Sequence, residues 1–214
     1  MTKINWDQLE QLEDGSQGWR VAFARGGTGH GLADLSGVYV PGEGGNPKAF
    51  IIGEAPGAQE ETQRRPFVGP AGIAMRDLMA IAGLYSAFTH TGGEPNCWLT
   101  NVVKFRPPRN RTPTPIEIKA ARPYLAMEWR AVGKPRVIVP VGGTALTAIT
   151  GKKQSILIAA GKLHKYRSRE GIDLYIWPMV HPSYGIRGGP SVQAVLEKDW
   201  ETFADWMGKY ASAT

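Results

Sequence analysis

The stretch that decides the fold is Ala49-Phe50-Ile51-Ile52-Gly53-Glu54-Ala55-Pro56-Gly57, in which four apolar residues run directly into glycines and a proline. This pattern predicts a buried strand that ends in a tight loop. Ligands of open α/β sheets bind just beyond the carboxyl ends of strands, so Glu54 lies where chemistry tends to occur. Three later segments strengthen this expectation: 64–69 (Arg-Arg-Pro-Phe-Val-Gly), 100–101 (Thr-Asn) after a second strand, and 181–184 (His-Pro-Ser-Tyr) after a late one.

Strand and helix patterns alternate along the chain. We expect strands at 49–52, 97–103, 136–141 and 172–180, and helices at 6–12, 70–83, 115–132, 143–149 and 191–206. Alternation favours a mostly parallel sheet with helices on both faces, a three-layer α/β/α sandwich. Pro123 is expected to kink or split the helix over 115–132. With no repeat or linker, the 214 residues are expected to form one domain, with a variable segment 1–37 packed on it.

Composition narrows the class of protein. A hydrophobic content of 42% is typical of a globular chain, and no apolar run approaches the roughly 18 residues of a membrane span. The chain opens with no signal peptide, so a cytoplasmic location is expected. The single cysteine, Cys97, excludes a disulfide framework, and the 4 histidines lack metal-ligand spacing. Neither a dinucleotide fingerprint nor a phosphate-binding loop is present, because Gly142-Gly143-Thr144 fails the spacing rule. No metal or cofactor is expected.

A net charge of +6 points to a polyanionic partner. The basic residues cluster beside the three candidate site loops, which favours a nucleic-acid backbone running past an active site, although solvated loop charges are the plain alternative. The candidate DNA-binding residues are Arg65, Lys104, Arg106, Arg109, Arg111 and Arg187.

Several motifs together resemble the uracil-DNA glycosylase superfamily, and most of all its family 4 branch. The resemblance spans roughly residues 38 to 206 in the family's order. It rests on segments 40–44 (Val-Pro-Gly-Glu-Gly), 53–57, 65–72 (Arg-Pro-Phe-Val-Gly-Pro-Ala-Gly), 100–108 (Thr-Asn-Val-Val-Lys-Phe-Arg-Pro-Pro), 110–115 and 181–184. It implies the fold of these enzymes and a monofunctional hydrolysis that removes uracil from DNA and leaves an abasic site in base excision repair.

One departure from family 4 is large. Those enzymes resemble one another in four cysteines that hold an iron–sulfur cluster, and two of the four positions correspond here to Phe105 and Ala121. Cys97 alone cannot supply the several thiolates that such a cluster needs. The resemblance therefore implies a cluster-free member in which ordinary packing, by Phe105 and N-terminal tryptophans, replaces the metal.

The chemistry assigns a role to four residues. Excision rotates the nucleotide out of the duplex and builds negative charge on the departing base. Phe67 is expected to stack on that base, unless it is a core residue, and Asn101 to read its O4 and N3–H edge, unless it caps the strand end. His181 would donate a hydrogen bond to O2, although a lone histidine is usually structural. Glu54 would stabilise the cationic sugar or orient the attacking water, or else tie down its own loop.

The resemblance also implies further pocket residues and a residue that contacts the DNA. Gly53, Ala55, Gly57 and Ser183 are expected to line the pocket, and Ile186 to fill the gap left by the flipped base. In the classical uracil-DNA glycosylases this loop resembles Gly-Gln-Asp-Pro-Tyr, so Ala55 stands opposite their aspartate. Gly57 stands opposite a tyrosine that excludes thymine, which leaves activity on 5-substituted uracils open.

Two other functions stay open at this point. One is a glycosylase of the same fold acting on hypoxanthine, xanthine or a modified pyrimidine. The other is a catalytically degenerate member that binds DNA or a protein. The expected partner is uracil-containing DNA, the expected state is a monomer, and no membrane contact is expected. Sequence leaves open the strand preference and the source organism.

Overall fold

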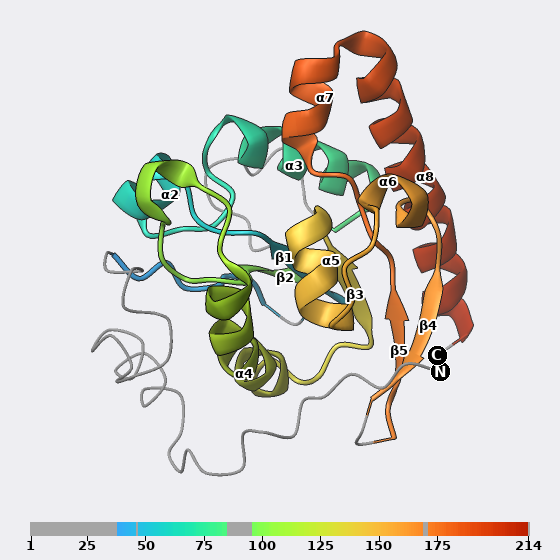
Figure 1. Cartoon of the computed structure of the whole chain (residues 1–214). Helices are drawn as coiled ribbons and strands as arrows, with labels where there is room; N and C mark the ends of the chain where they lie inside the picture. Colours follow the sequence, from blue (N-terminus) through green and yellow to red (C-terminus); the bar gives the residue numbers. More distant parts are fainter. Residues whose placement is uncertain (1–37, 46, 85–95, 169–170, 214) are drawn as a thin grey trace.

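The computed structural model describes residues 38–45, 47–84, 96–168 and 171–213, and Figure 1 shows the path of the chain. One five-stranded sheet runs through its centre in the order β2-β1-β3-β5-β4. Its strands are β1 (Ala49–Gly53), β2 (Cys97–Asn101), β3 (Val137–Pro140), β4 (His164–Arg167) and β5 (Asp173–Ile176). All neighbours pair in parallel except β4, which pairs antiparallel with β5 at one edge. The predicted mostly parallel sheet is confirmed.

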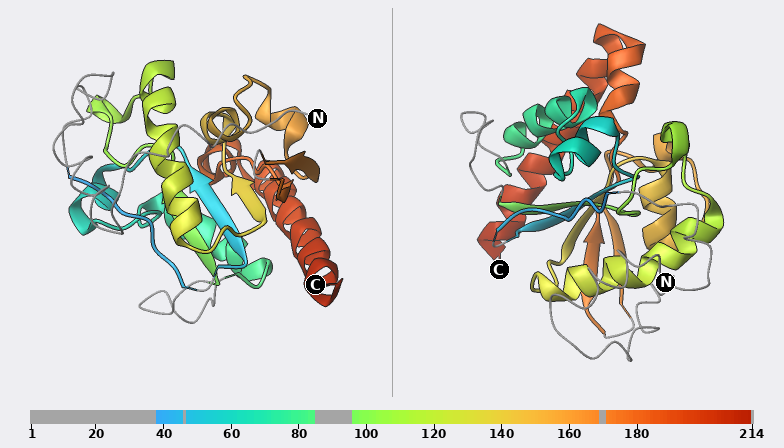
Figure 2. Two further views of the ribbon diagram at one scale, coloured as in Figure 1. Left: turned by 90° about the horizontal axis from the view of Figure 1, so that it is seen from below. Right: turned by 90° about the vertical axis from the view of Figure 1, so that its left-hand side faces the viewer.

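Helices cover both faces of this sheet, as the two views in Figure 2 show. They are α2 (Ala58–Gln63), α3 (Pro70–Ile81), α4 (Pro115–Ala131), α5 (Gly143–Thr150), α6 (Ile156–Ala159), α7 (Pro182–Gly188) and α8 (Pro190–Ala213), with the 3-10 turn η2 (Pro108–Asn110). Helices α4 and α5 pack on one face, and α3, α7 and α8 pack together on the other. Within the described residues, no helix is both long and apolar enough to cross a membrane.

The alternation of side chains along β1 explains the three layers. Phe50 and Ile52 belong to the core beneath α4 and α5, whereas Ala49 and Ile51 belong to the core beneath α3 and α8. Successive residues of a strand point to opposite faces of the sheet, so a strand that is apolar throughout is buried on both sides. All five residues of β1 are buried, as this requires. The apolar run Ala49–Gly53 therefore favours the α/β/α sandwich, because it supplies core residues to both faces of the sheet.

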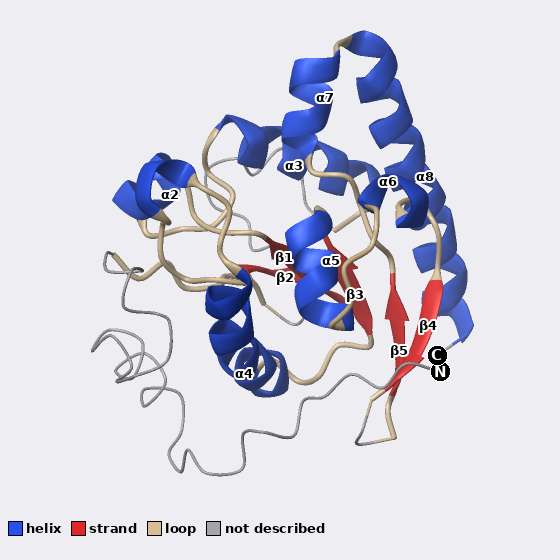
Figure 3. Ribbon diagram, viewed as in Figure 1, coloured by secondary structure: helices blue, strands red, loops and turns tan. Residues whose placement is uncertain are grey.

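Several elements differ from the prediction. Figure 3 shows the helices α2, α6 and α7 where loops were expected, and β4 is an additional edge strand. Helix α4 runs continuously through Pro123, so of the expected kink or split the split does not occur. Its start is strong, because Thr114 and Glu117 form a capping box and Pro115 occupies the first turn. The helix expected at 6–12 and the packing of segment 1–37 lie outside the described residues.

Candidate active site

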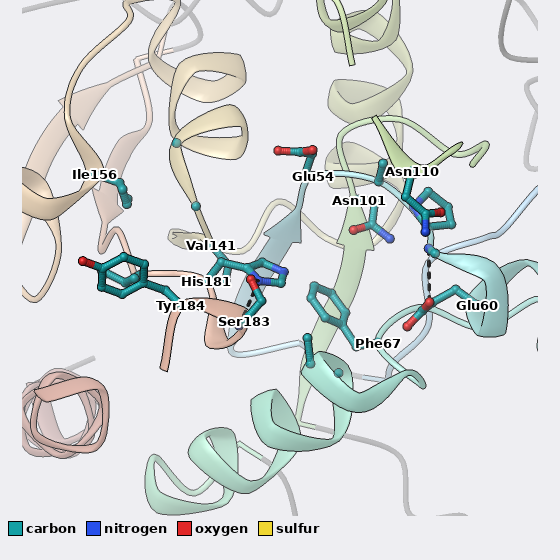
Figure 4. Close-up of a pocket in the computed structure, with 18 of the residues that line it drawn as sticks. Glu54, Glu60, Phe67, Asn101, Asn110, Val141, Ile156, His181, Ser183 and Tyr184 are labelled. Atoms are coloured by element: carbon teal, nitrogen blue, oxygen red, sulfur yellow. Dashed lines mark hydrogen bonds between the residues drawn. The ribbon is translucent and has the colours of Figure 1, made fainter. Parts of the chain in front are cut away.

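The carboxyl ends of the parallel strands meet at one edge of the sheet and form a cavity of about 700 Å³. The register of β1 and β2 sets Gly53 opposite Asn101, so the loop after β1 begins beside the last residue of β2. Of the predicted site residues, nine line this cavity: Glu54, Ala55, Gly57, Phe67, Asn101, Arg111, His181, Ser183 and Arg187. Figure 4 shows the rings of Phe67 and His181 and the side chains of Asn101 and Glu54 around the same space.

Gly53 leaves room for the side chains of Asn101 and Phe67 to lie close together. A methyl group at Gly53 would collide with the amide oxygen of Asn101 and would lie 2.7 Å from Cζ of Phe67. Only a residue without a side chain leaves room there for both groups. Gly53 therefore affects the shape of the pocket indirectly, because Asn101 and Phe67 occupy the space that its side chain would fill.

The turn that presents Phe67 is held from the side of helix α3. Phe67 adopts a left-handed backbone conformation with φ of 55°, which costs energy for any residue other than glycine. The guanidinium of Arg76 donates hydrogen bonds to the carbonyl oxygens of Phe67 and Pro66, each at 3.0 Å. A side chain at Gly72 would collide with the Phe67 backbone, so the turn rests directly on the helix.

A second charged group holds the same turn from the other side. One carboxylate oxygen of Glu60 accepts hydrogen bonds from the backbone N–H groups of Val68 at 3.0 Å and Gly69 at 2.7 Å. The other oxygen accepts the N–H of Gly57 at 3.1 Å. Glu60 thus joins the loop after β1 to the Phe67 turn. Neither Glu60 nor Arg76 could be predicted from local sequence patterns, because both bond to backbone groups of other segments.

Arg76 is itself paired with a carboxylate. Its guanidinium is 2.6 Å from Glu43, and Arg65 lies 2.8 Å from the other oxygen of Glu43. Burial alone would raise the pKa of Glu43, but the hydrogen bonds and charges of the two arginines outweigh it and lower the pKa. Arg65 was predicted to bind DNA, and the structure places it in this ion pair with about half of its side chain exposed.

Glu54 is held by Thr144, which is not among the predicted site residues. The hydroxyl of Thr144 donates a hydrogen bond of 2.6 Å to Oε2 of Glu54. Thr144 lies in the first turn of α5, and the two preceding glycines, Gly142 and Gly143, line the cavity. The sequence contains a signal for Thr144, since Gly142-Gly143-Thr144 directly follows a predicted strand, although the motif lacks the spacing of a phosphate-binding loop.

His181 caps helix α7 and is oriented by its own helix. The backbone N–H of Ser183 donates to Nδ1 of His181 at 3.2 Å, and the Ser183 hydroxyl lies 2.9 Å from the same nitrogen. Because the backbone N–H always carries its hydrogen, Nδ1 is an acceptor and the neutral ring holds its proton on Nε2. Burial lowers the pKa of His181, Glu54 opposes that shift, and Arg187 adds to it. The ring is therefore a neutral N–H donor at neutral pH.

The other predicted DNA-binding residues fall into two groups. Arg106 pairs with Glu61 at 3.3 Å, and Arg111 pairs with Glu117 at 2.6 Å. Arg109, Ile186 and Arg187 are exposed, and 57% of the Ile186 side chain is accessible to solvent. Ile186 and Arg187 lie on α7, next to the cavity that Arg187 lines.

The structure corrects the prediction for Lys104. Its ammonium is buried and forms an ion pair of 2.5 Å with Glu128, and it also donates to the hydroxyl of Thr100. Burial lowers the pKa of Lys104, and the Glu128 carboxylate opposes that shift. A side chain enclosed in this way cannot reach a phosphate, so Lys104 is a core residue and not a DNA contact.

The residues present do not fit an iron–sulfur cluster. Phe105 and Ala121 are both buried in the core beneath α4, and Phe105 packs edge-on against Tyr39 with ring centroids 5.9 Å apart. Cys97 lies in the core on the opposite face of the sheet, where burial raises the pKa of its thiol. Among the residues that the structure describes, no group of three or more His, Cys, Asp or Glu side chains could hold a metal ion.

The family is established by comparison with known proteins. Residues 41–204 match the Uracil DNA glycosylase superfamily. This range covers most of the chain and nearly all of the described fold, and the chain belongs to this superfamily.

Three relatives come from archaea and bacteria. A type-4 uracil-DNA glycosylase of Sulfurisphaera tokodaii is 36% identical over 169 residues, which are 76% of this chain and 71% of the relative. One of Archaeoglobus fulgidus is 33% identical over 177 residues, 80% of this chain and 83% of the relative. One of Thermotoga maritima is 36% identical over 150 residues, 69% of this chain and 71% of the relative. These findings confirm the predicted family and enzyme class, in a chain whose only cysteine is Cys97.

Proposed function

We propose that this protein hydrolyses the N-glycosidic bond of uracil in DNA and leaves an abasic site for base excision repair. The observation that carries the proposal is the convergence of Glu54, Phe67, Asn101 and His181, from separate segments, on one cavity. Each supplies a property that the reaction needs, and the type-4 relatives are named for this activity.

Recognition of the base falls to Phe67 and Asn101. A uracil rotated out of the duplex stacks its face on the Phe67 ring, as bases do on aromatic side chains. The amide of Asn101 donates to O4 and accepts from N3–H, and cytosine presents the opposite pattern. Asn101 is 5% exposed at the end of β2, so its amide has little freedom to turn over and accept cytosine instead.

Bond cleavage falls to His181 and Glu54. Negative charge builds on O2 of the departing uracil, and the Nε2–H of a neutral His181 donates a hydrogen bond to it. Because the lowered pKa of His181 keeps the ring neutral, no proton has to be lost before it acts. Glu54 stabilises the cationic sugar or orients the attacking water; both roles need a carboxylate held at the sugar side of the pocket.

Contact with the DNA falls to helix α7 beside the pocket. Ile186 fills the space that the flipped nucleotide leaves in the duplex, and Arg187 lies close to the backbone phosphates. Both side chains are exposed. A monomeric state and a cytoplasmic location stay predictions.

The proposal is tested with single-lesion oligonucleotides that are split by alkali after incubation. The wild-type protein should excise uracil, and Asn101→Ala and His181→Ala should each lose most of that activity while they keep the fold and the affinity for DNA. The loss should be about 100-fold or more, the scale of a preorganised donor in an active site. His164→Ala is the matched control, because His164 bonds to the carbonyl of Ala159 and does not line the cavity. Near-wild-type excision by either site variant would refute the assignment.

A second substrate class is favoured by Gly57. This residue lines the cavity without a side chain, and the group nearest to the space above it is the carboxylate of Glu60. The classical uracil-DNA glycosylases place a tyrosine at this position against the 5-position of the base, and Gly57 supplies no such side chain. The same panel should therefore include thymine and 5-substituted uracils opposite guanine, together with hypoxanthine and xanthine. A protein that binds these oligonucleotides but excises no base would be a degenerate, DNA-binding member.

A further inference from the structure

We propose that Thr144 is the positioning residue of Glu54: its hydroxyl holds one carboxylate oxygen so that the other faces the sugar. The inference rests on the proposed function for its kinetic consequences, but its geometric basis is independent of the substrate. Thr144 has no role in the motifs that define the site, and it reaches Glu54 from 90 residues further along the chain.

Two paired strands bring these residues together. Strand β1 pairs in parallel with β3, and the N–H of Val141 donates to the carbonyl of Ile52 at 2.8 Å. The loop that carries Glu54 and the start of helix α5 therefore leave the sheet side by side. Only two glycines separate Val141 from Thr144, so the hydroxyl arrives at the carboxylate with little chain in between. The sheet itself fixes this approach.

The contact has the geometry of a strong hydrogen bond. Its length of 2.6 Å is that of a hydroxyl donating to a charged carboxylate, a bond roughly twice as strong as one between neutral groups. Among the described residues, Glu54 forms no ion pair, and Thr144 is the only side chain that donates a hydrogen bond to it. Glutamate has three rotatable side-chain bonds, so without this anchor the half-buried carboxylate would sample several rotamers.

The anchor leaves Glu54 with one oxygen for the reaction. Oε2 is held by Thr144, and Oε1 remains for the cationic sugar or for the attacking water. Five other charged or titratable residues line the same pocket, namely Glu60, Arg111, His181, Tyr184 and Arg187. The charges of Glu54, Glu60 and Arg187 act on His181. When the Glu54 carboxylate is held in place, its distance from His181 is constant, and so is its effect on the pKa of His181.

The test compares two substitutions of Thr144. Thr144→Val has almost the same shape but no hydroxyl, whereas Thr144→Ser keeps the donor. In single-turnover excision of uracil, T144V should lose on the order of 10- to 100-fold in rate, the scale of a hydrogen bond to a charged group, with unchanged affinity for DNA. T144S should keep most of the wild-type rate. Thr147→Val, one turn further along α5, is the matched control and should retain the wild-type rate.

A double-mutant cycle separates positioning from structure. In an Glu54→Ala background the hydroxyl has no carboxylate to hold, so adding T144V should cost nothing further. If T144V lost activity by damaging helix α5, its effect would persist in that background. Equal rates for T144V and wild type, or a full additional loss in the Glu54→Ala protein, would overturn the inference.

Crystal structures of the wild type, T144V and T144S decide the matter even if uracil is not the substrate. The Glu54 carboxylate should occupy one position in the wild type and T144S, and several positions or a different one in T144V. An unchanged, ordered Glu54 in T144V would refute the inference regardless of activity. A wild type that excises no uracil, with Glu54 released in T144V, would instead refute the proposed function and leave the anchor established.

Discussion

The floor of the pocket and its rim are held in place in different ways. The floor consists of Phe67 and Asn101, and buried or half-buried charged groups brace the turn that carries Phe67: Arg76 bonds to its carbonyl and Glu60 to the N–H groups that follow it. The rim consists of Ile186 and Arg187 on helix α7, and both side chains are exposed.

Under the proposed function, the two regions would have separate tasks. Reading one base edge demands hydrogen bonds of fixed length and angle, so the floor uses strand ends and bonds from charged groups to hold its geometry. Contact with a DNA duplex demands side chains that reach outward, which an exposed helix supplies. The basic residues differ in the same way, because Lys104 is buried in the core and Arg187 is exposed to solvent.

The largest effect should come from removing a brace of the floor. Arg76→Met removes the donor to the carbonyls of Pro66 and Phe67 and one of the two arginines that pair with Glu43. Breaking a buried pair in this way should lower the free energy of unfolding by about 3 to 5 kcal/mol. Urea unfolding followed by tryptophan fluorescence measures it, and excision should fall with it because the strained Phe67 turn loses its support.

Arg64→Met is the matched control for that experiment. Arg64 is exposed and lies three residues before Phe67, so its loss should leave stability within experimental error. A stability of Arg76→Met equal to that of the control would contradict the bracing role and would reduce the contrast between floor and rim.

Much of the fold followed from local patterns. The apolar runs located β1, β2, β3 and β5, since strands buried on both faces need no alternation to be recognised. Strand β4 was not predicted, because its sequence His-Lys-Tyr-Arg contains no apolar run. It forms a strand because it pairs at the edge of the sheet. Helices α6 and α7 are too short to produce a clear period.

The candidate site was predictable where a residue lies at or beyond a strand end, or within a motif of the family. Glu54, Asn101 and His181 lie at or beyond strand ends, Phe67 lies in the motif 65–72, and the cavity contains all four. Arg76 and Glu60 could not be predicted, because they lie on helices and act on backbone groups that the fold brings near. Lys104 was misjudged for the same reason: its partner Glu128 is 24 residues further along the chain, and a charge beside a site motif looks the same whether it is buried or exposed.

On the rim, Ile186→Ala should have an intermediate effect. If Ile186 fills the space left by the flipped nucleotide, its loss leaves part of the unstacking cost uncompensated. We then expect excision from duplex DNA to slow roughly tenfold, which corresponds to about 1.4 kcal/mol of activation free energy. Excision from single-stranded DNA, which has no stack to refill, should change little. The measurement is the ratio of single-turnover rates on the two substrates. Val195→Ala, at an exposed apolar position on α8, is the control; an equal loss on both substrates would argue against the wedge.

The smallest effect should come from Arg187→Gln, and it tests whether the rim acts on the floor. One phosphate contact fewer should weaken binding a few-fold and reduce the slope of log affinity against log salt by about one unit.

Arg187 also helps to lower the pKa of His181, so its removal should let that pKa rise. The neutral ring is the active form: activity is present above the His181 pKa and is lost as the pH falls through it. In Arg187→Gln the acidic loss of rate should therefore begin at a higher pH than in the wild type. Single-turnover rates between pH 5 and pH 8, about the range in which histidines titrate, measure this shift. An unchanged pH profile with a reduced salt slope would mean that Arg187 serves the DNA alone, and that rim and floor are electrostatically independent.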